Sequence, residues 1–135
     1  MRKRTCAGGG NLDLLLDTQC LVWIAAGDQR LSVRARDAIT ALDTRIFVSA
    51  VTAWEYADLH HRGRLPAEAS FEAVRDALEA ELLDYPAEAW RIAKDLPDLH
   101  RDPIDRMLIA HAIHADLMLV TDDKLMRDYP VRTLW

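Results

Sequence analysis

Short apolar runs that end in polar residues constrain the fold of this chain most strongly. Leu12 to Leu16 is nearly continuous apolar sequence and stops at Asp17, and Leu117 to Val120 stops at Thr121 and two aspartates. Short runs of this kind suit strands that are buried on both faces, as in a parallel sheet. Further short strands are expected over residues 46–48, 82–85 and 131–134.

Segments with helical spacing of apolar residues lie between these runs. Capping residues stand at several expected helix starts, namely Thr18, Ser32, Ser49 and Asp102. The expected helices cover about residues 19–26, 32–42, 50–62, 67–81, 86–96 and 103–112, with a short helix or turn over 124–128. Strands that alternate with helices indicate an α/β fold with a mostly parallel sheet of four to five short strands.

Length and composition limit the class of protein. At 135 residues, 50% apolar and 29% charged, the chain is expected to form one soluble domain over residues 12–135. Residues 1–11 are expected to be a flexible tail without a secretory h-region, and no apolar run is long enough to span a membrane. Cys6 and Cys20 make neither a disulfide framework nor a metal-binding spacing, so a cytoplasmic protein is predicted. The net charge of −5 disfavours electrostatic binding of nucleic acid over a broad surface, but it does not exclude a local contact.

Acidic residues recur where a strand ends or a helix begins. Asp17 ends the first strand, and Asp122 or Asp123 ends a later one. Glu55 and Asp105 lie on the apolar stripes of their helices, where an unpaired carboxylate is costly to bury. In a right-handed α/β fold, these positions share one edge of the sheet. Carboxylates gathered there repel one another unless a cation joins them, and all-oxygen ligands select Mg²⁺ or Mn²⁺.

The predicted acidic site suits hydrolysis of a phosphodiester, because a divalent cation lowers the pKa of a bound water and offsets charge on the phosphate. Other interpretations stay open for single residues. Asp102 fits a helix cap first and a metal ligand second. Glu55 could instead pair with a neighbouring arginine or lie at the edge of its stripe. The sequence has no glycine-rich Walker loop, and no Ser–His–Asp or Cys–His arrangement stands out from its spacing.

Four segments carry a family resemblance: Leu14–Thr18, Val48–Ala50 with Trp54 and Glu55, His100–Ala112, and Leu119–Asp123. In this order they resemble the PIN-domain ribonucleases, in particular the VapC-type toxins of bacterial type II toxin–antitoxin pairs. The resemblance implies a three-layer α/β/α sandwich. It also implies a Mg²⁺-dependent endoribonuclease that hydrolyses RNA phosphodiesters by metal-activated water, leaving 5′-phosphate and 3′-hydroxyl ends. Such toxins are usually homodimers that a cognate antitoxin protein blocks.

The same resemblance assigns one or two Mg²⁺ or Mn²⁺ ions to four acidic positions, which here are Asp17, Glu55, Asp105 and Asp123. Asp122 is the neighbouring substitute for Asp123, and Thr121 would be a polar contact at the site. The sequence departs from the family on the substrate side. Gln19 stands where histidine is frequent, and Asp58 and Leu59 stand where an apolar residue and lysine are frequent.

Basic side chains near these segments have three interpretations: phosphate contacts, a surface for an acidic antitoxin segment, or solvated charge. They are His60, His61, Arg62, Arg64, Arg101 and Arg106. The basic stretch from Arg30 to Arg45 is expected to be a solvated face. Trp54 and Trp90 are expected in the core rather than as platforms for bases.

Two other functions stay open from the sequence. A non-catalytic PIN-like module that binds RNA or protein is compatible with Gln19, Asp58 and Leu59. A phospho-accepting receiver domain is also small, acidic and α/β. It needs paired acids after the first strand, whereas here the pair, Asp122 and Asp123, comes late in the chain.

Overall fold

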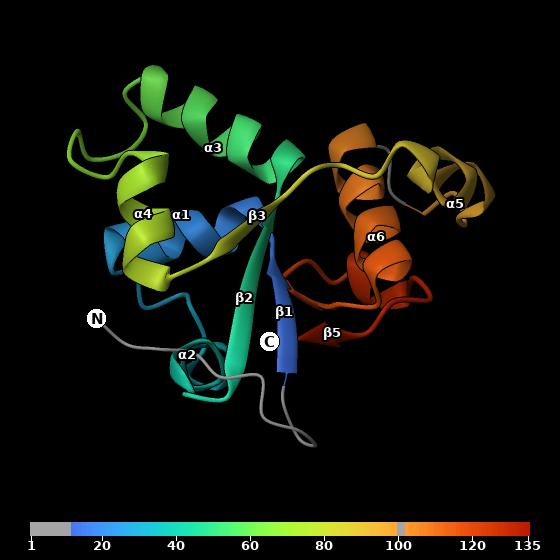
Figure 1. Ribbon diagram of the computed structural model, residues 1–135, viewed down its shortest axis with the longest axis horizontal. Helices are drawn as coiled ribbons and strands as arrows, with labels where there is room; N and C mark the ends of the chain where they lie inside the picture. The colour runs from blue at the N-terminus through green and yellow to red at the C-terminus, as the bar shows by residue number, and fades with distance from the viewer. Residues whose placement is uncertain (1–11, 100–101) are drawn as a thin grey trace.

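Parallel strands form the centre of the molecule. The computed structural model describes residues 12–99 and 102–135, and the expected tail over residues 1–11 lies outside the described residues. One sheet has the strand order β3-β2-β1-β4-β5, and every neighbouring pair is parallel (Figure 1). The strands are β1 Leu12–Leu16, β2 Thr44–Ser49, β3 Glu81–Leu83, β4 Met118–Val120 and β5 Thr133–Leu134. The predicted parallel sheet of short strands is confirmed.

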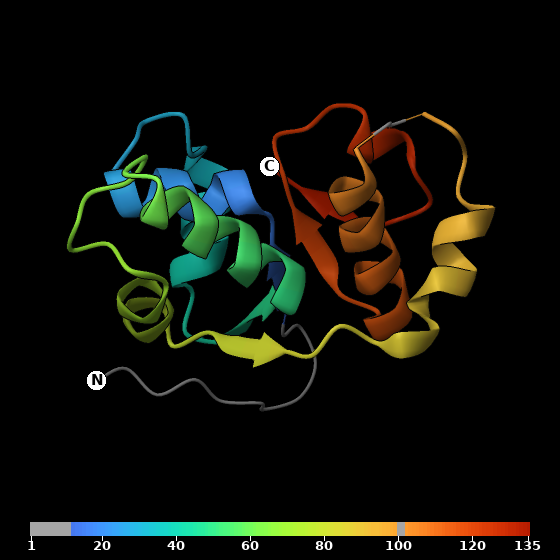
Figure 2. The ribbon, with the colours of Figure 1, turned by 90° about the horizontal axis from the view of Figure 1, so that it is seen from above.

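Helices cover both faces of the sheet, so the predicted three-layer α/β/α sandwich is also confirmed. In Figures 1 and 2, α1 to α4 lie to one side of the strands, and α5 and α6 lie to the other. The α-helices are α1 Thr18–Ala26, α2 Val33–Thr40, α3 Ala50–His61, α4 Phe71–Leu78, α5 Trp90–Asp95 and α6 Pro103–Ala115. Two single 3₁₀ turns are η1 Ala87–Ala89 and η2 Met126–Asp128. Within the described residues, none of the helices has the length and apolar character needed to cross a membrane.

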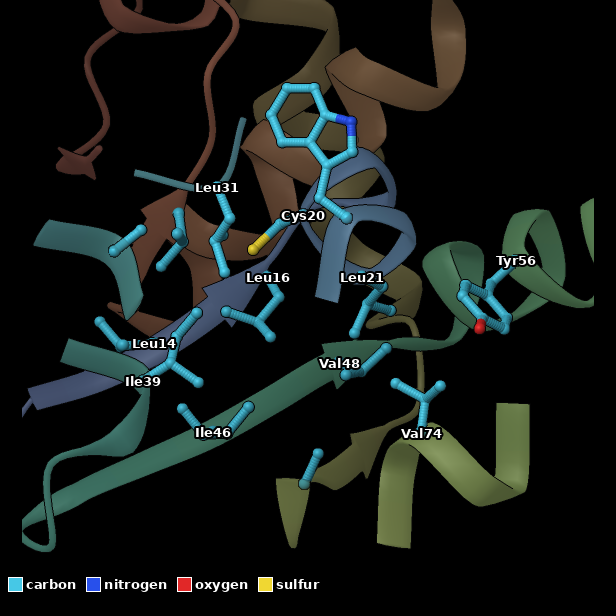
Figure 3. Packing of buried hydrophobic residues seen from close by; sticks show 14 of the residues in the cluster. Leu14, Leu16, Cys20, Leu21, Leu31, Ile39, Ile46, Val48, Tyr56 and Val74 are labelled. Carbon is cyan, nitrogen blue, oxygen red and sulfur yellow. The ribbon is translucent and has the colours of Figure 1, made fainter. Parts of the chain in front are cut away.

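Alternate residues of the central strand build two separate cores. Leu14 and Leu16 of β1 belong to a buried cluster with residues of α1 to α4 (Figure 3). Leu15, between them in sequence, packs in a second cluster with Leu108 and Ile109 of α6. Successive side chains of a strand point to opposite faces, so a strand covered on both sides needs an apolar residue at nearly every position. This requirement explains why β1 reads as an unbroken apolar run.

Two predicted helices are shorter in the structure than expected. The segment over residues 67–81 becomes helical only at Phe71, because the Ser70 hydroxyl caps α4 by accepting from the Ala73 N–H at 3.1 Å. Before it, the chain turns, with the Ala69 N–H donating to the Pro66 carbonyl at 2.9 Å. The segment over residues 86–96 divides into η1 and the short helix α5.

The prediction that Trp54 and Trp90 lie in the core is wrong. Trp54 is 66% exposed and Trp90 is 57% exposed. Helix α3 instead buries Thr52 and Tyr56, which follow a neighbouring stripe of the same helix. Burial of Tyr56 is tolerated because its hydroxyl donates to the Ala69 carbonyl at 2.8 Å, so its polar atom keeps a partner.

Candidate active site

A cleft of about 550 Å³ opens at the carboxyl edge of the sheet, and acidic side chains dominate its wall. The four acids predicted from the sequence all line it, and so does Asp122. The other lining residues are Thr18, Gln19, Val22, Trp23, Arg30, Leu59 and Met126. Asp17 follows β1, Glu55 lies on α3, Asp105 lies on α6, and Asp122 and Asp123 follow β4. The predicted convergence of these positions at one sheet edge is therefore present in the structure.

Asp17 is the most constrained acid of the cleft. Its side chain caps α1, with Oδ1 accepting from the Cys20 N–H at 2.7 Å, and its backbone N–H donates to the Val120 carbonyl at 3.2 Å. The residue is only 7% exposed. The sequence interpretation placed this cap at Thr18 and was wrong. Asp17, directly after β1, already has the extended backbone that an N-cap needs.

Burial raises the pKa of Asp17 from 3.8 to about 6. Hydrogen bonds from the Thr121 side chain and the Cys20 N–H lower the pKa, while the negative charges of Asp123 and Asp122 raise it. Thr121 thus contacts the site through Asp17. Burial outweighs the two hydrogen bonds because a carboxylate loses most of its hydration in this position. An ionised Asp17 is therefore a group that a cation would stabilise.

Thr18 has a different role from the predicted cap. Its hydroxyl donates to Oε1 of Glu55 at 2.5 Å, across from α1 to α3. This bond joins the two helices at the cleft and fixes one carboxylate oxygen of Glu55. The other oxygen, Oε2, makes no hydrogen bond within the part of the chain that the structure describes. Among the described residues the partner of Glu55 is therefore Thr18, and none of their arginines pairs with it.

The start of α6 carries two aspartates with different roles, one a helix cap and the other a residue of the cleft. Asp102 caps the helix, with Oδ1 accepting from the Ile104 N–H at 2.9 Å, and Pro103 occupies the first helical position. Asp105, almost one turn further along, lines the cleft and is half-buried. Asp102 is exposed and does not belong to the described residues that line the cleft. The interpretation of Asp102 as a cap is confirmed.

Both aspartates after β4 reach the cleft, but they differ in burial. Asp123 is half-buried, its backbone N–H donates to Thr121 Oγ1 at 3.1 Å, and its Oδ1 accepts from the Leu125 N–H at 2.9 Å. Asp122 is exposed. The turn therefore fixes Asp123 more firmly than Asp122, although each side chain could supply an oxygen to the cleft.

The side chains of the cleft offer the atoms that a hard divalent cation prefers, but they are not arranged around one. All five acidic side chains offer oxygen atoms, which Mg²⁺ and Mn²⁺ prefer. No three His, Cys, Asp or Glu side chains of residues 12–99 and 102–135 are already arranged to hold an ion. The cause is physical, because carboxylates without a cation between them repel and turn to other donors, as Glu55 turns to Thr18.

Most of the basic residues singled out in the sequence serve the fold or its surface. Arg106 is 19% exposed, and its guanidinium donates to the carbonyls of Pro97 at 2.7 Å and Ala93 at 2.8 Å, at the end of α5. Arg62 pairs with Asp58 at 3.0 Å. None of the predicted basic residues that the structure describes lines the cleft, and Arg101 lies outside the described residues. Arg106 is therefore a structural residue rather than a phosphate contact.

Sequence reasoning missed the one cation and the one aromatic ring among the described residues that line the cleft, Arg30 and Trp23. Both line it, although Arg30 was expected on a solvated face. Arg30 reaches the cleft from the loop between α1 and α2, and loop geometry leaves no periodic signal in a sequence. Gln19 and Leu59, where the sequence departs from the PIN family, also line the cleft.

Comparison with known proteins gives a family and a set of similar folds. The model of the PIN domain family matches residues 14–131. A search of curated proteins finds no match. The family match favours the PIN interpretation over the phospho-accepting receiver domain.

Solved structures with similar folds include toxin–antitoxin proteins. A chain in the structure of VapBC2 from Rickettsia felis, bound to a DNA fragment from its promoter, has a TM-score of 0.69 at 16% identity; the match covers 91% of this chain and 98% of that one. DNA-bound VapBC from Salmonella typhimurium gives 0.65 at 21% identity, covering 91% and 97%. VapC20 of Mycobacterium tuberculosis, a sarcin-ricin-loop-cleaving toxin, gives 0.62 at 16% identity, covering 84% and 93%. At these identities the likeness is one of fold.

Proposed function

Because this chain belongs to the PIN domain family, we propose that it is a metal-dependent endoribonuclease and the toxin of a type II toxin–antitoxin pair. The observation that carries the proposal is the convergence of Asp17, Glu55, Asp105 and Asp123 on one cleft from four separate places in the chain. Carboxylates gathered at the carboxyl edge of a parallel sheet suit a hard divalent cation and, through it, a phosphate. RNA is the proposed substrate and phosphodiester hydrolysis the proposed reaction.

Mg²⁺ or Mn²⁺ is the proposed cofactor, with the four carboxylates as its ligands and Asp122 as the substitute for Asp123. When bound, the cation supplies Lewis acidity that lowers the pKa of a water and offsets charge on a phosphate oxygen. The fit rests on the all-oxygen donors of the cleft. Because no three of the described acidic groups are already arranged around an ion, the side chains of the cleft would rotate when one binds.

Residues of the chain itself prepare this cleft. Asp17 is held in place as the cap of α1, and its burial makes the ionised form costly unless a positive charge is near. Thr18 orients Glu55 by binding Oε1, which leaves Oε2 as the oxygen for a ligand. The first turn of α6 presents Asp105, where the helix dipole favours a negative charge.

The proposed partners follow from the fold. Its likeness to VapBC chains supports a cognate antitoxin that binds this protein. A homodimer is also proposed, and light scattering would detect it as twice the mass of the 15.3 kDa chain. The cytoplasm is the proposed location, on the basis of the cysteine content.

Metal-dependent RNA cleavage tests the function. The purified chain, freed of any antitoxin, is incubated with RNA in Mg²⁺, Mn²⁺ or EDTA. We expect cleavage with metal and none with EDTA. Asp105→Asn and Glu55→Gln should each lower the rate about a hundredfold or more, because each removes a charge from the reacting centre. Asp95→Asn, an exposed acid of α5 outside the cleft, is the matched control and should cleave like the wild type.

Two results would contradict the nuclease. One is an antitoxin-free protein that cuts no RNA with any metal, and the other is an Asp105→Asn protein as active as the wild type. Gln19 and Leu59, which depart from the PIN family and line the cleft, favour a second candidate, a non-catalytic module that binds RNA or protein. RNA binding without cleavage in every metal would support that candidate.

A further inference from the structure

Arg30 is the one basic side chain among the described residues that line the acidic cleft. It lies on the loop between α1 and α2, and its side chain is 71% exposed. RNA is a polyanion, and a wall of carboxylates repels the phosphates on either side of the one that is cut. A guanidinium at the edge of that wall is the group in the cleft with the opposite charge.

Asp28 holds the Arg30 side chain in a fixed orientation. The Arg30 Nε donates to Asp28 Oδ1 at 3.1 Å, and Nη2 donates to Asp28 Oδ2 at 2.7 Å. The Arg30 backbone N–H also donates to Asp28 Oδ1, at 2.8 Å. These bonds lower the pKa of Asp28 to about 2, so the carboxylate stays ionised at neutral pH. Both partners are therefore charged at the neutral pH at which RNA would bind.

The ring of Trp23 packs against the same guanidinium. The Arg30 Cζ lies 5.3 Å from the centroid of the Trp23 ring, which places the cation over the aromatic face. Trp23 is only 6% exposed and packs against Trp135 with ring centroids 5.5 Å apart, so this platform is rigid. Both Trp23 and Arg30 line the cleft.

The geometry leaves one edge of the guanidinium available to a ligand. Nε and Nη2 are directed at Asp28, whereas Nη1 makes no hydrogen bond within the described residues. Two N–H donors on Nη1 are thus oriented in advance by a salt bridge and an aromatic ring. Donors of this kind suit the oxygens of a phosphate, because a charged N–H···O⁻ bond is stronger than a neutral one.

We propose that Arg30, held by Asp28 and stacked on Trp23, binds a backbone phosphate of single-stranded RNA that neighbours the phosphodiester in the acidic cleft. The proposal rests on the proposed ribonuclease function and adds a substrate contact to it. It gives the cleft two parts, in which carboxylates serve the cut phosphate and Arg30 holds the next one. It also supplies a cationic contact in the cleft that Leu59 lines, and Leu59 stands where a lysine is frequent in the PIN family.

RNA affinity in an uncleaved complex tests this contact. Arg30→Ala, Arg30→Lys and Arg34→Ala are each made in the Asp105→Asn protein, and binding of a labelled single-stranded RNA is followed by fluorescence anisotropy over a salt series. Arg34 is an exposed arginine of α2 outside the cleft, which makes it the matched control. Arg30→Ala should weaken binding about tenfold and lower the slope of log K against log salt by about one phosphate contact. Arg30→Lys should keep the slope but recover only part of the affinity, because lysine lacks the planar fork.

Two further measurements distinguish the loss of a phosphate contact from damage to the fold. Circular dichroism and melting temperature of Arg30→Ala should match the control, since the side chain is exposed. In the cleaving protein, Arg30→Ala should raise KM more than it lowers kcat, as expected for a residue that binds substrate without acting at the reacting atoms.

The outcomes distinguish this proposal from the proposed function. If the wild type cleaves RNA but Arg30→Ala binds RNA like Arg34→Ala with the same salt slope, the Arg30 contact is overturned and the nuclease stands. If the wild type cuts no RNA while Arg30→Ala still loses affinity, the nuclease is overturned and the contact stands. If the chain neither cuts nor binds RNA, both are overturned.

Discussion

Helices α1 and α6 both begin with an aspartate cap, yet the two caps lie in opposite environments. Asp17 accepts from the Cys20 N–H at 2.7 Å and is buried in the wall of the cleft. Asp102 accepts from the Ile104 N–H at 2.9 Å and is exposed outside it. The local hydrogen bond is the same, so the cap alone does not determine which aspartate belongs to the site.

The difference between the two helix starts comes from the elements before them, a strand for α1 and a helix for α6. Asp17 directly follows β1, the central strand, whose neighbours β2 and β4 enclose its carboxyl end. Asp102 follows the connection from α5, on the outer side of the sheet, and α6 brings an acid to the cleft only at Asp105. Topology therefore decides the role of each acid, and the following predictions test that separation from the largest effect to the smallest.

Substitutions of the two capping aspartates should differ most in their effect on the rate of RNA cleavage. Asp17→Asn keeps an oxygen that can cap α1 but removes a charge from the cleft, so the rate should fall about a hundredfold or more. Asp102→Asn makes the identical change at α6 and should leave the rate within about threefold of the wild type. The measurement is the initial rate with Mg²⁺ in excess. Equal losses in the two variants would show that capping, and not the cleft, explains Asp17.

Asp17→Asn, which should slow RNA cleavage, should instead make the metal-free protein more stable. The pKa of Asp17 in the fold is about 6, against 3.8 for an ordinary aspartate, so the fold holds this proton more tightly than the unfolded chain does. The stabilisation from Asp17 is complete below the ordinary pKa and is lost as the pH rises through about 6. Above that pH, Asp17→Asn should be more stable than the wild type by about 3 kcal/mol, because a pKa shift of about two units is worth that much.

Urea denaturation in EDTA measures this difference at about pH 4 and about pH 8. The gain from Asp17→Asn should be present at the higher pH and nearly absent at the lower. Asp102→Asn is the control, and its effect should not grow with pH in the same way. A destabilised Asp17→Asn at the higher pH would contradict the burial cost assigned to Asp17.

Substitution of Arg106 should lower the stability of the fold without changing RNA binding. Its guanidinium binds the carbonyls of Ala93, Leu96 and Pro97, which joins the first turn of α6 to the end of α5. Arg106→Met keeps much of the side-chain volume but leaves these carbonyls without their charged donor, and should cost about 2 kcal/mol of unfolding free energy. The salt dependence of RNA binding should stay that of the wild type. A lowered salt slope would instead make Arg106 a phosphate contact.

Removal of the exposed cap should have the smallest effect. Asp102→Ala takes away the partner of the Ile104 N–H and should cost about 1 kcal/mol, the usual value for an aspartate cap. Thermal unfolding checks the magnitude. A loss several times larger would mean that Asp102 holds α6 in place for the cleft, and the contrast between the two helix starts would disappear.

The sequence predicted the parts of the molecule that follow from periodicity and strand ends. β1 is recognisable because burial on both faces demands an apolar run, and Asp17 follows from the place where that run stops. Asp105 was recognisable as an acid on an apolar helix stripe. These signals lie in consecutive residues or at helical spacing, so one sequence is enough to read them.

Contacts between distant elements could not be read in this way. Thr18 fits a cap in the sequence, but its hydroxyl crosses to Glu55, 37 residues later. Arg106 resembles a surface charge, although its partners end a different helix. Trp54 lies on the stripe of α3 that reads as apolar in the sequence, yet α3 buries Tyr56, whose hydroxyl donates to the distant Ala69 carbonyl. Arg30 reaches the cleft through a loop, whose course no spacing rule predicts.

Binding of Mn²⁺ followed by electron paramagnetic resonance tests most directly whether the acidic cleft is a metal site. The wild type and Asp102→Asn should bind Mn²⁺ with the same stoichiometry and similar affinity, because Asp102 lies outside the cleft. Asp17→Asn should bind it at least about tenfold more weakly, since a ligand and a charge are lost. No Mn²⁺ bound by the wild type, or equal binding by Asp17→Asn, would contradict the assignment of the cleft.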